Sequence, residues 1–280
     1  MSPHLPSRVR SVVTTLAAAL SCSLVLSGCG AADPSAESSD GTVRGILEEL
    51  VAAFPDDAQV SVMAADGDII TVGEVPESIA WSTIKVPIVI EALREGEDDL
   101  GEQAKLAITE SDNDAASALF DTLGGGYQAS TKVDNLLREA DDTTTLTLPN
   151  AALGGDTGFG MTQWSSADQA RFAAWMACSD EDAVQHVYRL MSDLVDSQAV
   201  GIETTDGGHA KSGWGTNEHT GVSTMRQMGT IDTDAGLVAM SIVITGDRLD
   251  DVTEEIDVLD DWLADHAGEL PRTQCDAEGQ

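Results

Sequence analysis

Apolar positions recur along the chain with two spacings, one typical of helices and one of strands. From Thr42 to Phe54 they follow helical spacing, and Pro55-Asp56-Asp57 ends the pattern. Gln59 to Ala64 and Ile69 to Val72 flank Asp66-Gly67, which predicts a hairpin of two strands. We therefore expect this part of the chain to contribute one helix and two paired strands.

Helical spacing then dominates the middle of the chain. Helices are predicted from Ser82 to about Arg94, from Lys105 to Leu123, from Ser166 to Ala177 and from Asp182 to Val195. Gly124-Gly125-Gly126 ends the second of these, and Ser166 with Gln169 resembles a capping box at the start of the third.

The remaining chain returns to strands. Strands are predicted over His209 to Gly215, Ser223 to Ile231 and Gly236 to Thr245, followed by an amphipathic helix from Asp251 to His266. This order predicts an α+β fold: an antiparallel sheet of about five strands, flanked by N- and C-terminal helices, with an all-helical subdomain inserted. Within a domain over 42–270, we assign 42–80 and 205–270 to the sheet subdomain, 81–204 to the helical subdomain, and 271–280 to a tail.

The N-terminus has the pattern of an export signal over residues 1–28. Arg8 and Arg10 precede an apolar stretch from Val12 to Leu26, and no acidic residue occurs before Asp33. Leu26-Ser27-Gly28-Cys29 resembles the lipobox of bacterial lipoproteins, which implies lipidation of Cys29 and anchoring on the outer face of the cell membrane. The alternative is an ordinary cleaved signal with an unmodified cysteine. Residues 29–41 are polar enough to predict a flexible tether.

The charge of the chain is strongly negative. It carries 14 basic and 49 acidic residues, a formal net charge of −35, and this excludes nucleic acid as a partner. We expect a monomer with a solvated acidic surface. Only four lysines occur: Lys85, Lys105, Lys132 and Lys211. Because lysine is so rare, the positions where it remains are informative.

Two of these lysines lie in short motifs with hydroxyl residues. In Ser82-Thr83-Ile84-Lys85 a hydroxyl and an amine share one face of a helix, whose start is fixed by Pro87. A neutral Lys85 there can take the proton of Ser82, and the helix N-terminus can stabilise an oxyanion. Ser-x-x-Lys alone is a weak signal.

Two further motifs follow in order, Ser111-Asp112-Asn113 and Lys211-Ser212-Gly213. Each has a plainer interpretation, since Ser111 can be a helix-surface serine, Asn113 a cap, and Lys211 a solvated strand residue. His209, two residues before Lys211, is more simply an edge residue, so we assign it no role. All three motifs in this order form the set known for serine β-lactamases and penicillin-binding proteins.

The sequence resembles the class A β-lactamase and D,D-peptidase superfamily over about residues 42 to 267. The resemblance implies that Ser82 is the acylated nucleophile, Lys85 its base and Ser111 a proton relay to the leaving nitrogen. It further implies that Lys211 holds a substrate carboxylate, that Asn113, Ser212 and Gly213 bind substrate, and that the N–H groups of Ser82 and Trp214 form the oxyanion hole. Ser212 replaces the commoner threonine.

Two departures from the class A pattern limit the expected activity. The segment between the Ser82 helix and Ser111 is shorter than in β-lactamases. Those enzymes also carry a Glu-x-x-x-Asn loop whose glutamate activates the deacylating water, whereas Thr143 to Gly160 contains no Glu and only one acid, Asp156. We expect slow deacylation of a β-lactam or D-alanyl-peptide ester. The alternative is a catalytically decayed lipoprotein that serves as a binding or scaffold domain on the envelope.

Cysteine usage is sparse. With Cys22 in the signal and Cys29 lipidated, Cys178 and Cys275 remain, and in an exported protein one leftover pair predicts a disulfide. Two separate buried thiols are the alternative. No metal-ligand spacing such as His-Glu-x-x-His occurs, so we expect no metal and no cofactor.

Overall fold

The computed structural model describes residues 34–96, 99–150, 158–273 and 275, with side chains described from residue 41 onward. The predicted signal segment 1–28, the lipidation site Cys29 and the acid Asp156 lie outside the described residues. Within the described residues, no helix is long and apolar enough to cross a membrane.

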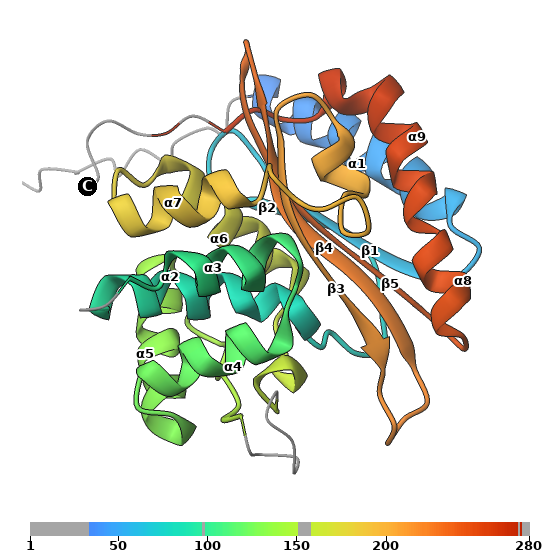
Figure 1. Ribbon diagram of the computed structural model, residues 1–280. Coiled ribbons are helices and arrows are strands. Elements are labelled where there is room, and N and C mark those ends of the chain that lie inside the picture. The colour runs from blue at the N-terminus through green and yellow to red at the C-terminus, as the bar shows by residue number, and fades with distance from the viewer. Residues whose placement is uncertain (1–33, 97–98, 151–157, 274, 276–280) are drawn as a thin grey trace, which may run out of the picture.

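The centre of the molecule is a five-stranded sheet in the order β2-β1-β5-β4-β3 (Figure 1). All neighbouring strands are antiparallel, so the N-terminal and C-terminal parts of the chain share one sheet, which confirms the predicted fold class. Its strands are β1 (Asp57–Met63), β2 (Ile69–Gly73), β3 (Gly208–Thr216), β4 (Ser223–Thr233) and β5 (Gly236–Gly246). β3 is an edge strand, so one side of its backbone is available to other groups.

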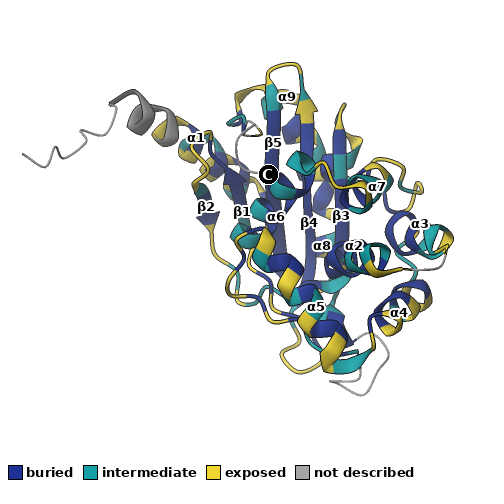
Figure 2. Cartoon of the chain, turned by 90° about the vertical axis from the view of Figure 1, so that its left-hand side faces the viewer, coloured by how far each residue is buried: buried dark blue, intermediate teal, exposed yellow. Residues whose placement is uncertain are grey.

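Helices cover both faces of the sheet (Figure 1). One face carries α1 (Pro34–Ala53), α8 (Leu249–Glu254) and α9 (Ile256–His266). The helices inserted between β2 and β3 lie on the other: α2 (Lys85–Glu95), α3 (Gly101–Thr109), α4 (Asn113–Thr122), α5 (Gly126–Glu139), α6 (Ser166–Cys178) and α7 (Asp182–Leu190). Short 3-10 segments η1 (Trp81–Ile84), η2 (Gly158–Met161), η3 (Gly201–Thr204) and η4 (Ala267–Glu269) connect them. Figure 2 shows the central strands buried under these layers.

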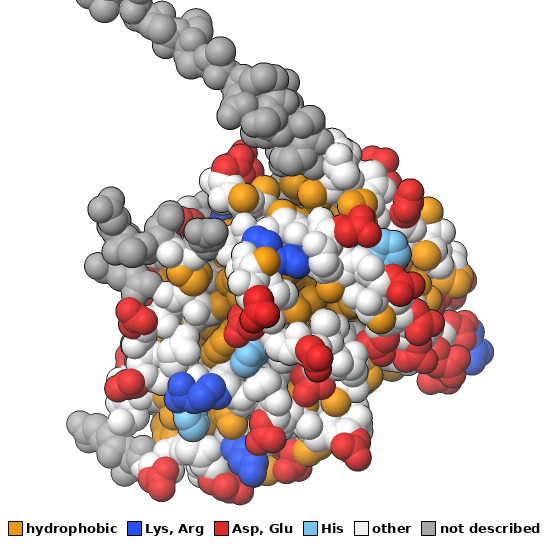
Figure 3. Space-filling view, turned by 90° about the horizontal axis from the view of Figure 1, so that it is seen from above, with side chains coloured by type: hydrophobic (Ala, Val, Ile, Leu, Met, Phe, Trp, Pro, Cys, Tyr) orange, Lys and Arg blue, Asp and Glu red, His pale blue; other side chains and the backbone are white. Residues whose placement is uncertain are grey.

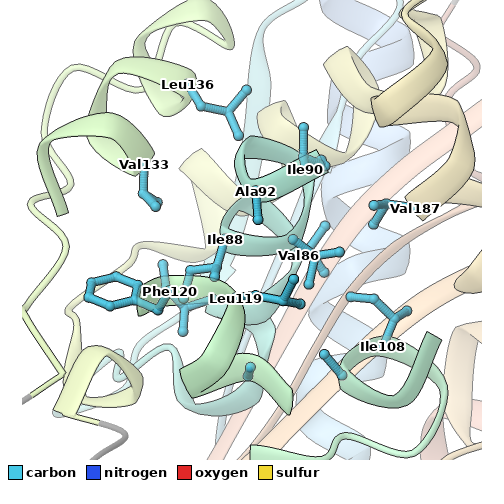
Figure 4. Packing of buried hydrophobic residues seen from close by; sticks show 14 of the residues in the cluster. Val86, Ile88, Ile90, Ala92, Ile108, Leu119, Phe120, Val133, Leu136 and Val187 are labelled. Atoms are coloured by element: carbon cyan, nitrogen blue, oxygen red, sulfur yellow. The ribbon is translucent and has the colours of Figure 1, made fainter. Parts of the chain in front are cut away.

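Each layer has its own hydrophobic core. On the inserted side, apolar residues of α2 point in several directions at once, toward α3, α4, α5 and α7 (Figure 4). Val86, Ile88 and Ile90 have no exposed surface, and burying each such side chain contributes about 1.5–3 kcal/mol. Because the first six residues of α2, 85–90, are all buried, the start of the helix that follows Ser82 is held firmly in place.

The predicted single helix from Lys105 to Leu123 is wrong, because the structure divides it into α3 and α4. Ser111 adopts φ +58°, a left-handed conformation that a helix interior does not tolerate. Asp112 is extended and caps α4, its carboxylate accepting a hydrogen bond from Ala115 N at 2.7 Å. The break turns the Ser-Asp-Asn triplet into a tight corner.

Other element boundaries also differ from prediction. α1 begins at Pro34, so part of the expected 29–41 tether is helical. α5 was not predicted, although its buried positions, Ala129, Val133, Leu136 and Leu137, follow helical spacing. The α6 cap is Ser165 rather than Ser166, and the predicted C-terminal helix is divided between α8 and α9 at Glu255.

Cys178, the last residue of α6, forms a disulfide with Cys275, which closes a loop of 97 residues. The bond ties the C-terminal segment to the inserted helical layer.

Candidate active site

Ser82 lies in a turn that enters α2 directly. The turn is the 3-10 segment η1, and Thr83 N donates to Ala80 O at 3.1 Å. Pro87 sits in the first turn of α2, where its missing N–H has no cost, as the sequence predicted. Ser82 is partly exposed, and its hydroxyl forms no hydrogen bond with another described residue. It is therefore open to an incoming substrate.

The residue before Ser82 is held in a strained conformation. Trp81 has φ +49°, which costs about 1–3 kcal/mol for a bulky residue. β3 is pressed against this turn, because a Cβ built on Gly213 would lie 2.6 Å from Ser82 N. A Cβ on Gly215 would likewise lie 2.4 Å from the Trp81 ring. Gly213 and Gly215 thus allow the strand to approach the nucleophile.

The amine of Lys85 is fully engaged by the neighbouring corner. It donates to Asn113 Oδ1 at 2.7 Å, to Ser111 Oγ at 3.3 Å and, by a short contact, to Ser111 O. A neutral amine has two N–H donors, enough for the bonds to Asn113 and the carbonyl, and keeps a lone pair for a proton. Lys85 is 1% exposed, so these partners replace water.

The environment of Lys85 favours its neutral form. Burial lowers the pKa of the amine to about 8, while the nearby Asp112 carboxylate opposes part of this shift. A pKa near the working pH is what a general base requires. Asp112 belongs to the Ser-Asp-Asn triplet, and no role was predicted for it from the sequence. Its position as the helix cap, three residues before Ala115, is the local signal that could have identified it.

Lys211 approaches the same hydroxyl from β3. Its Nζ donates to Ser111 Oγ at 3.0 Å and to Ser212 O at 3.0 Å. Burial, and then repulsion from Lys85, holds its pKa well below the usual lysine range. Two lysines from different subdomains therefore lie within hydrogen-bond distance of Ser111 Oγ.

The backbone of β3 presents an N–H group beside Ser82. Ala210 N donates away from β4, to Met191 O at 3.0 Å. Alternate residues of an antiparallel strand point the same way, and β3 keeps an uninterrupted register with β4, so Trp214 N–H also points to the free edge. Trp214 N–H thus lies at the free edge of the strand that contacts the Ser82 turn through Gly213.

Ser212 does not join this group. It has no exposed surface, and its hydroxyl accepts a hydrogen bond from Gln227 Nε2 at 3.0 Å. Gln227 also bonds Val200 and Ile202, on the face covered by α9 and η3. The Ser212 hydroxyl therefore makes a structural contact in place of the expected contact with substrate. Its side chain points away from the site because neighbours along a strand point to opposite faces.

His209 also has a plain role. Its ring stacks on Tyr188, with centroids 3.9 Å apart, and its Nδ1 lies 3.0 Å from Tyr188 O. It faces α7 and makes no contact with Ser82. Among the described residues no group of His, Cys, Asp or Glu side chains could hold a metal ion.

Comparisons with known proteins agree on the fold. No family model and no curated protein matches the chain. Solved structures do: a β-lactamase from Chitinophaga pinensis has a TM-score of 0.62 and 13% identity, over 80% of this chain and 99% of that one. TLA-1 extended-spectrum β-lactamase has a TM-score of 0.60 and 14% identity, over 81% of this chain and 99% of that one. PBP-A has a TM-score of 0.56 and 20% identity, over 81% of this chain and 96% of that one. The chain therefore has the fold of class A β-lactamases and PBP-A.

Proposed function

We propose that this protein is an acyl-serine hydrolase of the β-lactamase and penicillin-binding type, acylated at Ser82 and slow to deacylate. The observation that carries the proposal is the convergence of Lys85 and Lys211 on Ser111 Oγ, with Lys85 three residues after Ser82. The substrates are β-lactams or D-alanyl-peptide-like molecules. A mutant of PBP-A, which shares the fold, is known as an acyl-enzyme complex with penicillin G.

The proposed acylation proceeds in three proton transfers. Lys85 Nζ takes the proton of Ser82, and Oγ attacks the substrate carbonyl carbon, whose oxygen becomes negative between the N–H groups of Ser82 and Trp214. When the C–N bond breaks, the leaving nitrogen takes the proton of Ser111 Oγ. Lys85 then returns its proton to Ser111, which restores both groups.

The remaining groups orient the substrate. Asn113 Oδ1 is engaged by Lys85, so its side-chain NH₂ is left to donate to a substrate amide carbonyl. Lys211 lies next to Ser111 and is the cation placed to attract a substrate carboxylate. A bound carboxylate would raise the pKa of Lys211 and favour its protonated form.

Deacylation lacks an evident base. No carboxylate among the described residues contacts the Ser82 hydroxyl, and residues 143–160 contain no Glu. Since no described carboxylate is positioned to activate water, we expect the acyl-enzyme to persist for minutes or longer.

Intact-mass measurement with penicillin G tests this function. We expect one equivalent of added mass, located on Ser82 by peptide mapping and retained for minutes or longer. Ser82→Ala should show no addition, while Ser179→Ala, which changes a serine that is partly exposed like Ser82, should label normally. Absence of any adduct and of any hydrolysis would contradict the proposal and favour a non-catalytic envelope protein. Rapid turnover would contradict slow deacylation only.

We also propose that the protein is exported and lipid-anchored through Cys29, since the lipobox-like Leu26-Ser27-Gly28-Cys29 follows a signal-like segment. Cell fractionation tests the anchor: the protein should be found with membranes, and Cys29→Ser should release it. Equal membrane association of both forms would refute the anchor.

A further inference from the structure

Arg226 is a buried cation on β4 without an acidic partner. It has no exposed surface, and no acidic side chain in the described part of the chain forms a salt bridge with it. Burial lowers the pKa of its guanidinium, and its Nε has no hydrogen-bond partner among the described residues. Burying a charge without an ionic partner is costly unless hydrogen bonds satisfy it. The acceptors of the guanidinium therefore decide what Arg226 does at this position.

The acceptors of the guanidinium belong to two chain segments beside the nucleophile. Arg226 donates to Ile79 O at 2.8 Å and to Ser78 Oγ at 3.3 Å in the first segment, and to Trp164 O at 3.0 Å in the second. These segments are bridged to each other by Ala80 N to Thr162 O at 2.7 Å. The Arg226 guanidinium thus joins the segment that leads into η1 to the segment that leads into α6.

A second set of bonds reaches the nucleophile turn itself. Arg226 donates to Gln169 Oε1 at 2.6 Å, and Gln169 Nε2 donates to Thr83 Oγ1 at 2.7 Å. The Thr83 hydroxyl in turn donates to Ala80 O at 2.5 Å. Ala80 and Thr83 enclose Trp81 and Ser82, so this buried relay holds both ends of the strained turn.

Arg226 also lies directly below the point where β3 meets the turn. Its cross-strand partner is Gly213, where a Cβ would lie 2.6 Å from Ser82 N and 3.0 Å from Ala80 O. The absence of a side chain at Gly213 brings the turn close to the sheet, and Arg226 fixes it there from the neighbouring strand. A left-handed residue such as Trp81 persists only when its surroundings enforce it.

We infer that Arg226 is a positioning residue: its bonds to Ile79, Trp164 and Gln169 hold the Trp81-Ser82 turn in the geometry that directs Ser82 N–H into the oxyanion hole. The expected effect on the acylation rate constant rests on the proposed function, whereas the expected effect on the Trp81-Ser82 turn does not. Arg226 does not touch the reacting atoms, so its loss should lower the acylation rate constant and leave the substrate dissociation constant unchanged.

The test compares Arg226→Met, Arg226→Lys and the control Thr230→Val in full-length protein. Thr230 is a buried residue on the same face of β4 that bonds Tyr188 at 2.7 Å, remote from the turn. With penicillin G, Arg226→Met should acylate at least about 100-fold more slowly, comparable to loss of one oxyanion-hole donor. Arg226→Lys, which keeps the charge and fewer bonds, should be intermediate, and Thr230→Val should match the wild type.

A wild-type acylation rate constant in folded Arg226→Met, or a loss confined to the dissociation constant, would overturn the inference. If wild-type protein is not acylated, the proposed function fails, and hydrogen exchange still tests the positioning role. Arg226→Met, or Arg226→Lys if the former does not fold, should speed exchange at the amides of residues 80–83 beyond the change in Thr230→Val. Unchanged exchange there would refute the positioning role.

Discussion

The pH dependence of acylation should reveal Lys85 as the base. At its ordinary pKa of 10.5 an amine is about 0.03% neutral at pH 7, whereas at a pKa of about 8 it is roughly 10% neutral. Burial therefore increases the population of the competent base about 300-fold. The acylation rate constant should rise about tenfold per pH unit below pH 8 and level off above it.

Two substitutions separate Lys85 from other titrating groups. Lys85→Arg should abolish acylation, because a guanidinium keeps its proton at every pH of the assay. Asp112→Asn removes the carboxylate that raises the pKa of Lys85, and the amide still caps α4, so the rising limb should move to lower pH with the fold intact.

Stopped-flow acylation with penicillin G from pH 6 to 9 measures both effects. A pH-independent rate constant, or retained acylation in Lys85→Arg, would show that the base is another group. If the rising part of the pH–rate profile does not move in Asp112→Asn, Asp112 does not influence the pKa of Lys85.

Two further predictions concern the frame around the site. Gly213→Ala should lower the acylation rate constant by at least about 100-fold, because the new Cβ would meet Ser82 N at 2.6 Å and displace the oxyanion donor. Gly45→Ala in α1, where nothing lies within 4 Å, is the control and should leave acylation unchanged. Replacing Cys178 and Cys275 together with serine should lower the free energy of unfolding by about 4–5 kcal/mol in the chain-entropy model, measured by urea denaturation. An unchanged urea midpoint would mean that the 97-residue loop is not constrained by this bond.

The fold class could be predicted because its elements carry strong local patterns. Apolar spacing over residues 59–72 and 209–245 identified the strands, and turn residues such as Asp66-Gly67 placed their ends. The sequence indicated that the N- and C-terminal portions share one sheet, but the order of its strands came only from the structure. Boundaries at Ser111 and Glu255 were missed, since each is a break inside a continuous helical pattern.

The residues of the candidate site could likewise be predicted only in part. Ser82, Lys85, Ser111 and Lys211 were predicted from motifs, and the structure brings Lys85 and Lys211 to the hydroxyl of Ser111. Arg226 was not predicted, because a lone arginine within a strand pattern carries no local signal for burial. Its partners lie 57 to 148 residues away in sequence, so only the tertiary structure reveals them.

The charge distribution explains how so acidic a chain can serve an anionic substrate. Acidic side chains are spread over the face seen in Figure 3, with fewer Lys and Arg among them, and the net charge is −35. Water and salt screen this surface within about 10 Å at 0.1 M. Lys85 and Lys211 are instead buried beside Ser111, where screening is weaker and a charge acts more strongly on its neighbours. A substrate carboxylate that raises the pKa of Lys211 and favours its protonated form can therefore be attracted locally more strongly than the distant surface repels it.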